Sequence, residues 1–172
     1  GVTQSNIYNY VRTKGDILYL VCEHLVGLYT QAVDEVVAAH EDPHERLVEA
    51  VRAVMGVMFR HRDELVLLYN ETHALEKDDR KLVLKAVARL NKQFQDLLDA
   101  YVARFGPIRV GNRRLAANLL TFVPAIVALR WWDLSIYSTR EEAEQGIFDF
   151  ILGGLGIQPT PPSPGSKAGP PA

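Results

Sequence analysis

Cysteine is nearly absent from this chain of 172 residues, which has a single one, Cys22. One thiol excludes a framework of disulfides within the chain and is typical of a reducing compartment such as the cytoplasm. Because Cys22 stands in an apolar helical pattern, we interpret it as a core residue rather than a reactive thiol. We find no secretory signal before the predicted fold, and a cytoplasmic protein is expected.

The patterns of enzyme and metal sites are also missing. The sequence has no glycine-rich phosphate loop, no serine-centred elbow and no dense cluster of cysteine and histidine. The stretch from His40 to His44 matches a zinc pattern by letter, but Pro43 separates its histidines, which must share one continuous helix. Asn70-Glu71-Thr72 matches a glycosylation acceptor, although nothing indicates secretion. We therefore predict no enzyme activity, no metal and no cofactor.

An excess of charge of either sign is lacking. The 19 lysines and arginines nearly balance the 21 aspartates and glutamates, which leaves a net charge of −2 and no overall attraction to DNA. The hydrophobic content of 48% is ordinary for a globular protein. The length suits one domain with a substantial core.

Helical patterns run through the whole chain, and no alternating strand pattern of useful length is present. The fold class expected is therefore all-α. Several helix starts follow from capping residues and from proline at the first helical position. They are Thr13 with Asp16, Asp42 with Pro43, Asp78 or Asp79, and Thr139 with Glu142. A shorter helix is expected around Asp63 to His73, and Gly106-Pro107 should end the long one that follows it.

Apolar residues at helical spacing predict the buried faces of these helices. Tyr29 is among the apolar positions of the first long helix. The seam of the helix after Asp79 comprises Val83, Val87, Leu90, Phe94, Leu97 and Tyr101. The apolar face of the last helix comprises Ala143, Ile147, Phe150, Ile151 and Leu155.

The segment Leu115–Trp132 is apolar almost all round and is interrupted by Asn118, Thr121 and Arg130. A helix without a polar face must be buried on several sides. The uninterrupted run is too short and too polar at its ends for a membrane span. We therefore expect contact with the core on one side and a second subunit on the other. Pro124 should kink the helix because proline removes a backbone hydrogen bond.

The first fourteen residues have the pattern of a DNA-recognition helix with its turn. Thr3 is a good N-cap, and Ile7 should face a core. The second helix of a helix-turn-helix unit lies in the major groove, and a supporting helix precedes the turn. Because the chain starts at the turn, we expect residues 1–172 alone not to bind operator DNA specifically. The short polar candidates for DNA contact are Thr3, Gln4, Ser5, Asn6 and Asn9.

This stretch closely resembles the TetR family of bacterial transcription regulators. The residues that carry the resemblance are Gly1, Val2, Thr3, Tyr8, Tyr10, Lys14 and Asp16-Ile17-Leu18. Val11 and Arg12 depart from it. The resemblance implies a homodimeric, all-helical repressor or activator that leaves DNA when a small molecule binds. It also implies phosphate contacts by Tyr8 and Lys14, and a four-helix dimer interface made by Leu115–Trp132 and Thr139–Leu155.

Three regions are expected from these patterns. Residues 1–14 are the remnant of a helix-turn-helix head, and residues 15–157 form a helical ligand-binding and dimerisation domain. Residues 158–172 are rich in proline, glycine and serine and are expected to be a disordered tail.

A ligand site is expected where polar residues stand among apolar ones. Small-molecule sites are mostly apolar with a few placed polar groups. The candidates are Tyr69, Asn70, His73, Phe122, Arg130 and Trp131. Each also has a purely structural interpretation: the aromatic residues as core or interface, the polar ones as links between helices, and Arg130 as a partner of Glu71 or Asp133.

The stretch Tyr69–Leu75 also resembles a branch of the family that responds to acyl-CoA thioesters. That resemblance implies an apolar pocket for the acyl chain and a basic mouth for the phosphates, for which the candidates are Lys77, Arg80, Lys81 and Arg130. A multidrug-type or aromatic effector is the alternative. Two other classes of protein compete with a regulator. A catalytic group with a perturbed pKa in a pocket would favour a helical enzyme, and a solid core without a cavity would favour a purely structural dimerisation module.

Overall fold

The computed structural model describes residues 13–71 and 75–159, and helices make up most of both ranges. Within these ranges no strand occurs, which confirms the all-α prediction. The elements are α2 (Lys14–Ala39), α3 (Pro43–Arg60), α4 (Arg62–Glu71), α5 (Lys77–Phe105), α6 (Arg113–Phe122), the 3₁₀ turn η2 (Val123–Ala125), α7 (Ile126–Leu134) and α8 (Arg140–Leu155). The expected recognition helix lies outside the described residues.

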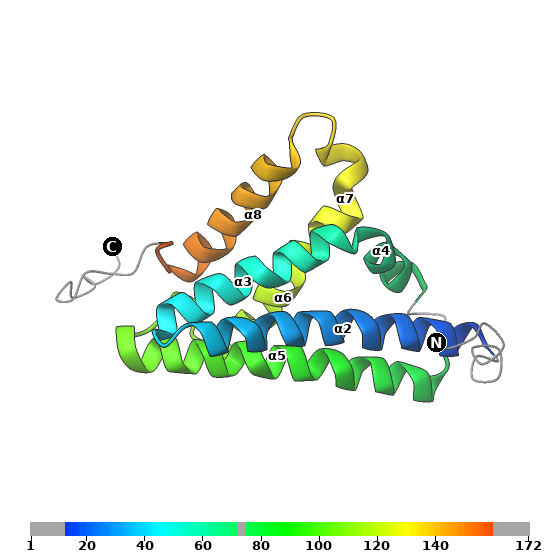
Figure 1. The fold of residues 1–172 in the computed structure, drawn as a ribbon, viewed down its shortest axis with the longest axis horizontal. Helices are drawn as coiled ribbons and strands as arrows, with labels where there is room; N and C mark the ends of the chain where they lie inside the picture. The colour runs from blue at the N-terminus through cyan, green and yellow to red at the C-terminus, as the bar shows by residue number, and fades with distance from the viewer. Residues whose placement is uncertain (1–12, 72–74, 160–172) are drawn as a thin grey trace.

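The long helices α2 and α5 lie side by side along the longest axis of the molecule (Figure 1). Helix α3 contacts both of them, and α6 lies against α5. Helices α7 and α8 project away from α2 and α5, and the loop that joins them lies at the top of the view in Figure 1. Most of the buried apolar side chains belong to one core, among them Leu25, Leu47, Val54, Phe94, Leu98, Leu120 and Phe148.

Three of the predicted helix starts are confirmed. At α2 the Thr13 hydroxyl accepts from the Asp16 amide at 3.1 Å, and the Asp16 carboxylate accepts from the Thr13 amide at 2.9 Å. Thr139 and Glu142 form the same reciprocal capping box at α8. Asp42 accepts from two amides of the first turn of α3, with Pro43 at the first helical position. Each pair satisfies backbone amides that have no partner within the helix.

The predicted cap of α5 is wrong. The helix begins at Lys77 with Glu76 as its N-cap, and the Glu76 side chain makes no capping hydrogen bond. Asp78 and Asp79 stand in the first turn instead, where negative charge is favoured by the helix dipole. The carboxylate of Asp79 lies against Gly15 of α2, so closely that a Cβ atom on Gly15 would lie 2.4 Å from Asp79 Oδ2.

The prediction for one residue of the apolar face of α8 is also wrong, because Phe150 is exposed rather than buried. Phe150 is 72% exposed in the single chain, whereas Phe148 is 1% exposed and belongs to the core. The guanidinium of Arg52 on α3 lies 4.1 Å from the centre of the Phe148 ring. The rest of the predicted face, which includes Ile151 and Leu155, is turned inward.

Pro124 interrupts the apolar segment as predicted. Helix α6 ends at Phe122, the 3₁₀ turn η2 contains Pro124, and α7 continues from Ile126. One side of this segment is buried, with Ala116, Ala117 and Leu120 in the core. Its other side is open in the single chain, and its exposed apolar side chains are Leu115, Leu119, Phe122, Ile126 and Trp132.

The whole helical run Arg113–Leu134 has 22 residues and is apolar enough to cross a membrane by length and composition alone. This run is longer than the uninterrupted apolar stretch expected from the sequence, because α6, η2 and α7 together include the polar residues at both ends of that stretch. Core helices of soluble proteins have the same composition, and this run contributes seven buried residues to the fold.

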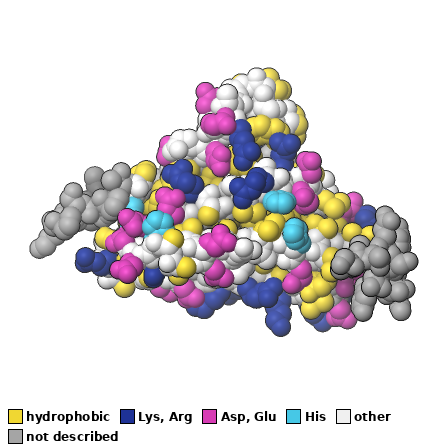
Figure 2. All heavy atoms as spheres, viewed as in Figure 1, with side chains coloured by type: hydrophobic (Ala, Val, Ile, Leu, Met, Phe, Trp, Pro, Cys, Tyr) yellow, Lys and Arg dark blue, Asp and Glu magenta, His cyan; other side chains and the backbone are white. Residues whose placement is uncertain are grey.

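The surface carries both signs of charge. Figure 2 shows acidic and basic side chains interspersed over the visible face, in keeping with the net charge of −2. Apolar side chains reach this surface near α4 and around α7.

Candidate ligand cavity

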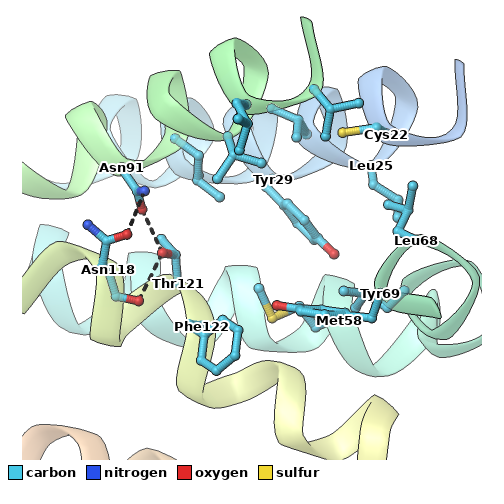
Figure 3. Close-up of a pocket in the computed structure, with 16 residues that line it drawn as sticks. Cys22, Leu25, Tyr29, Met58, Leu68, Tyr69, Asn91, Asn118, Thr121 and Phe122 are labelled. Carbon is cyan, nitrogen blue, oxygen red and sulfur yellow. Dashed lines mark hydrogen bonds between the residues drawn. The ribbon is translucent and has the colours of Figure 1, made fainter. Parts of the chain in front are cut away.

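A cavity of about 270 Å³ lies between α2, α3, α4, α5 and α6. Figure 3 shows its lining side chains converging from these helices. The lining residues are Cys22, Leu25, Val26, Tyr29, Met58, Leu65, Leu68, Tyr69, Val83, Leu84, Val87, Leu90, Asn91, Asn118, Thr121 and Phe122. None of these carries a formal charge at neutral pH, so the cavity suits an uncharged, largely apolar group.

The cavity has a buried floor and an open rim. Leu25, Met58 and Leu90 are buried and form part of the floor. Leu84 of α5 and Phe122 of α6 are exposed by more than half and form part of the rim. The rim that faces solvent is therefore largely apolar.

Tyr29 of α2 is the polar group set deepest in the cavity. Its side chain is 5% exposed and points into the cavity (Figure 3). Its hydroxyl has no hydrogen-bond partner among the described residues. Burial raises the pKa of Tyr29 well above its usual value, so the hydroxyl stays protonated and able to donate.

At the other end of the cavity, three polar side chains form a cluster that joins α5 to α6. They are Asn91, Asn118 and Thr121. The Thr121 hydroxyl donates to the side-chain oxygen of Asn91 at 2.6 Å, and the Asn91 amide donates to the side-chain oxygen of Asn118 at 3.1 Å. The Asn118 amide donates to the carbonyl of Arg114 at 2.8 Å. Figure 3 shows this cluster facing Tyr29 across the cavity. Its members bond to one another, and Asn118 is exposed, so the cluster forms a polar wall at the edge of the cavity.

Two aromatic rings meet at the rim. Tyr69 of α4 and Phe122 of α6 are edge to face, with ring centres 5.8 Å apart and planes at 74°. Edge-to-face contacts of this kind are favourable by about 0.5–1.5 kcal/mol beyond the buried area. Partial burial raises the pKa of Tyr69, so this hydroxyl is also neutral at ordinary pH.

Cys22 lies in the wall of the cavity near the start of α2 and is buried. Burial raises the pKa of the thiol to about 11, with the nearby carboxylate of Glu23 adding to the shift. Reaction with disulfide reagents requires the thiolate. The structure thus supports the interpretation of Cys22 as an inert core residue.

We expect Cys22 to react with dithiobis(nitrobenzoate) at pH 8 about 100-fold more slowly in the folded chain than in denaturant. The factor follows from the smaller thiolate fraction at a raised pKa, before any effect of access. Raising the pH through 9 towards 11 should accelerate the folded-state reaction steeply. Equal rates in buffer and denaturant would show that the thiol is open to solvent.

The end of α4 connects the cavity to the beginning of α2. Glu71 stands two residues after Tyr69 and forms an ion pair of 2.5 Å with Lys14, the first residue of α2. Both side chains are partly exposed, and pairs of this kind contribute about 0–1 kcal/mol. The pair thus links the C-terminal end of α4 to the first residue of α2.

The structure brings together only two of the six predicted ligand residues. Tyr69 and Phe122 line the cavity, whereas Asn70 is exposed and does not. Arg130 is exposed, and its guanidinium lies 6.0 Å from the Trp132 ring centre. Trp131 lies edge to face with Phe59 at 6.2 Å, away from the cavity. His73 lies outside the described residues.

The alternative partners suggested for Arg130 have other contacts. Glu71 pairs with Lys14, and Asp133 accepts from the Tyr137 hydroxyl at 3.0 Å. Of the predicted DNA-contacting residues only Lys14 is described. The others, Thr3, Gln4, Ser5, Asn6, Tyr8 and Asn9, lie outside the described residues.

Sequence reasoning missed the residues that contribute most polarity to the cavity, which are Tyr29 and the cluster of Asn91, Asn118 and Thr121. A partial signal was present, because Asn118 and Thr121 interrupt an apolar helix three residues apart, on one face. Tyr29 gave no signal, since a tyrosine at an apolar helical position is usually a core residue.

Residues 40–155 match the protein family described as "Tetracyclin repressor-like, C-terminal domain". Among curated proteins, the HTH-type transcriptional regulator HbdR of Aromatoleum sp. (strain CIB) is 29% identical over 146 residues. The match covers 85% of this chain and 64% of that protein. The chain thus spans a little under two thirds of the length of this relative.

Two solved structures have the same fold. A regulatory protein of the tetR family from Rhodococcus RHA1 superimposes with a TM-score of 0.75 and 17% identity, over 91% of this chain and 81% of that one. The TetR family transcriptional regulator PfmR from Thermus thermophilus gives 0.71 and 16%, over 91% and 83%. At this identity the likeness establishes the fold alone. Because the family match covers most of the chain and includes α3 to α8, the chain belongs to the TetR family of transcriptional regulators.

Proposed function

We propose that this chain is the effector-binding and dimerising part of a DNA-binding transcriptional repressor that a small hydrophobic molecule releases from its operator. The observation that carries this proposal is the cavity, where a deeply buried tyrosine hydroxyl stands without a partner in otherwise apolar surroundings. A purely structural helical module would gain stability by filling such a space. A ligand-responsive regulator, in contrast, requires the space for its effector.

The proposed division of the chain follows the expected boundaries. Residues 15–157 form the effector and dimerisation domain, and residues 1–14 belong to the reading head. In that head Thr3, Gln4, Ser5, Asn6, Tyr8 and Asn9 contact operator DNA together with Lys14. Residues 158–172 belong to neither part, and the protein acts in the cytoplasm.

The proposed mechanism uses the contact between α4 and α2. An effector that enters between α5 and α6 displaces Tyr69, and Glu71 moves with it. Helix α4 packs directly against α2, so its movement shifts α2 and changes the separation of the two recognition helices in the dimer. Operator half-sites lie about one helical turn apart, so a modest displacement prevents both from being engaged together. The effector must bind the DNA-incompetent state more tightly for this to occur.

Lys14 can serve both partners in this scheme. Its ammonium pairs with Glu71 here and, as proposed, with a DNA phosphate in the operator complex. An exposed ion pair is weak enough to exchange for a phosphate contact. In this proposal Lys14 pairs with Glu71 when DNA is absent and with a phosphate when DNA is bound.

The effector we favour is hydrophobic in its buried part. An acyl-CoA thioester satisfies this if only its acyl group enters, because no described lining residue is basic. The suggested basic mouth has other contacts: Arg80 donates to the Leu75 carbonyl at 3.1 Å, and Lys81 pairs with Asp78 at 2.9 Å. An aromatic effector is the second candidate, favoured by the Tyr69–Phe122 pair at the rim.

The proposal is tested with the natural protein at its full length. We expect selection from a random DNA pool to recover a palindromic site bound at physiological salt. Native mass spectrometry of the protein as purified should show a dimer, and a discrete mass released by denaturation would identify an effector. Adding that effector should weaken operator binding at least about tenfold in a gel-shift titration. If the protein bound all DNA sequences equally, with the same salt dependence for each, this result would count against a specific regulator.

A further inference from the structure

The Tyr29 hydroxyl is the one buried polar group of the described cavity lining that lacks a partner. The side chain is buried, Leu25 of α2 and Met58 of α3 line the same cavity, and the Tyr29 hydroxyl points into it (Figure 3). A buried hydroxyl without a partner is unfavourable, and a ligand that supplies one recovers that loss.

The polar side chains of the opposite wall already have hydrogen-bond partners. Asn91, Asn118 and Thr121 already bond to one another and to backbone carbonyls of α6. Filling the cavity therefore leaves one strong polar requirement, at Tyr29. Because the tyrosine is neutral and protonated, an acceptor on the ligand meets that requirement best.

The size of the cavity sets the size of the group. An apolar cavity of about 150 Å³ holds benzene. The present cavity of about 270 Å³ has room for a group of roughly bicyclic size. No described lining residue could neutralise an ionised group, and burying an unpaired charge is strongly unfavourable.

We propose that the cavity selects an uncharged, apolar group of bicyclic size bearing one carbonyl-type acceptor, that this acceptor receives a hydrogen bond from the Tyr29 hydroxyl, and that ionised groups are excluded. This inference rests on the proposed function, since the bound group would be the effector or the part of the effector that is buried. Tyr29 is then the residue that determines specificity, and a ketone, ester or thioester carbonyl qualifies, whereas a carboxylate does not.

The test compares three probes of nearly equal shape: 2-acetylnaphthalene, 2-isopropylnaphthalene and 2-naphthoate. Their dissociation constants for the purified chain are measured by calorimetry or by naphthalene fluorescence. We expect the ketone to bind about tenfold more tightly than the hydrocarbon, which corresponds to one buried hydrogen bond. We expect 2-naphthoate to bind at least about 100-fold more weakly than the ketone.

Tyr29→Phe removes one oxygen atom and keeps the ring. We expect this variant to lose the preference for the ketone while it binds the hydrocarbon as the parent does. The matched control is Tyr101→Phe, which alters a buried tyrosine of α5 outside the cavity and should keep the preference. Circular dichroism and thermal unfolding establish that both variants are folded.

A ketone preference of about tenfold that persists in Tyr29→Phe would overturn the inference, as would equal binding of 2-naphthoate or no binding of any probe. These results leave the proposed function standing if an effector still releases operator DNA. Conversely, ketone binding that depends on Tyr29 but never affects DNA would support the inference and contradict the proposed regulator.

Discussion

Replacing Leu98 by alanine is expected to lower the free energy of unfolding by about 2–5 kcal/mol. Leu98 lies on α5 and is 0% exposed, surrounded by the main core. Truncation removes favourable burial and leaves a void, and both terms destabilise the fold. Because single domains are stable by only about 5–15 kcal/mol, this one change should remove a large part of the total.

The measurement is urea denaturation followed by circular dichroism at fixed protein concentration, with the slope compared to confirm that only stability has changed. Leu82→Ala provides the matched control on the same helix. Leu82 is 45% exposed, so the same truncation there should cost no more than about 0.5 kcal/mol. If both variants unfolded at the same urea concentration, the described core position of Leu98 would be incorrect.

Replacing Phe150 by aspartate is expected to convert a dimer into a monomer. Phe150 on α8 is exposed in the single chain, as are Ile126 and Trp132 on α7. Large exposed apolar side chains on neighbouring elements are expected at an interaction surface. In the proposed dimer these side chains lie in the interface formed by Leu115–Trp132 and Thr139–Leu155. Aspartate there would bury an unpaired charge in place of an aromatic anchor.

We expect the dimer dissociation constant to rise at least about 100-fold, the size of a strong interface position. Analytical ultracentrifugation over a dilution series measures it, and circular dichroism checks that the helices persist. Leu82→Asp introduces the same charge at an exposed apolar site of α5 and should leave the dimer intact. A Phe150→Asp protein that remained dimeric at every concentration would place the interface elsewhere.

Local sequence determined where three of the described helices start. A capping box needs only residues three apart, so Thr13 with Asp16 and Thr139 with Glu142 could be recognised without knowledge of the fold. The prediction failed at Asp78 and Asp79, which lie in the first turn of α5 rather than at its cap. Asp79 reaches across to Gly15 at the start of α2, and such a contact leaves no trace in the neighbouring sequence.

Helical periodicity identified the buried seam of α8 but not its edges. Phe148 and Phe150 flank the seam through Ile147 and Ile151 on opposite sides, each about 100° from one of its residues. Either phenylalanine could have faced the core. The position of α3 decided between them, since Arg52 lies over the ring of Phe148.

The sequence by itself determined that the chain is helical, where Pro124 breaks the apolar segment, and that its first fourteen residues resemble a recognition helix. These features depend on residues close together in the chain. Only the tertiary structure assembled the cavity, because Tyr29, Asn91 and Thr121 come from three helices and meet through the contacts of α2 with α5 and of α5 with α6. It also showed that the Tyr29 hydroxyl lacks a partner among the described residues, since the absence of a hydrogen bond depends on every neighbour that folding places around it.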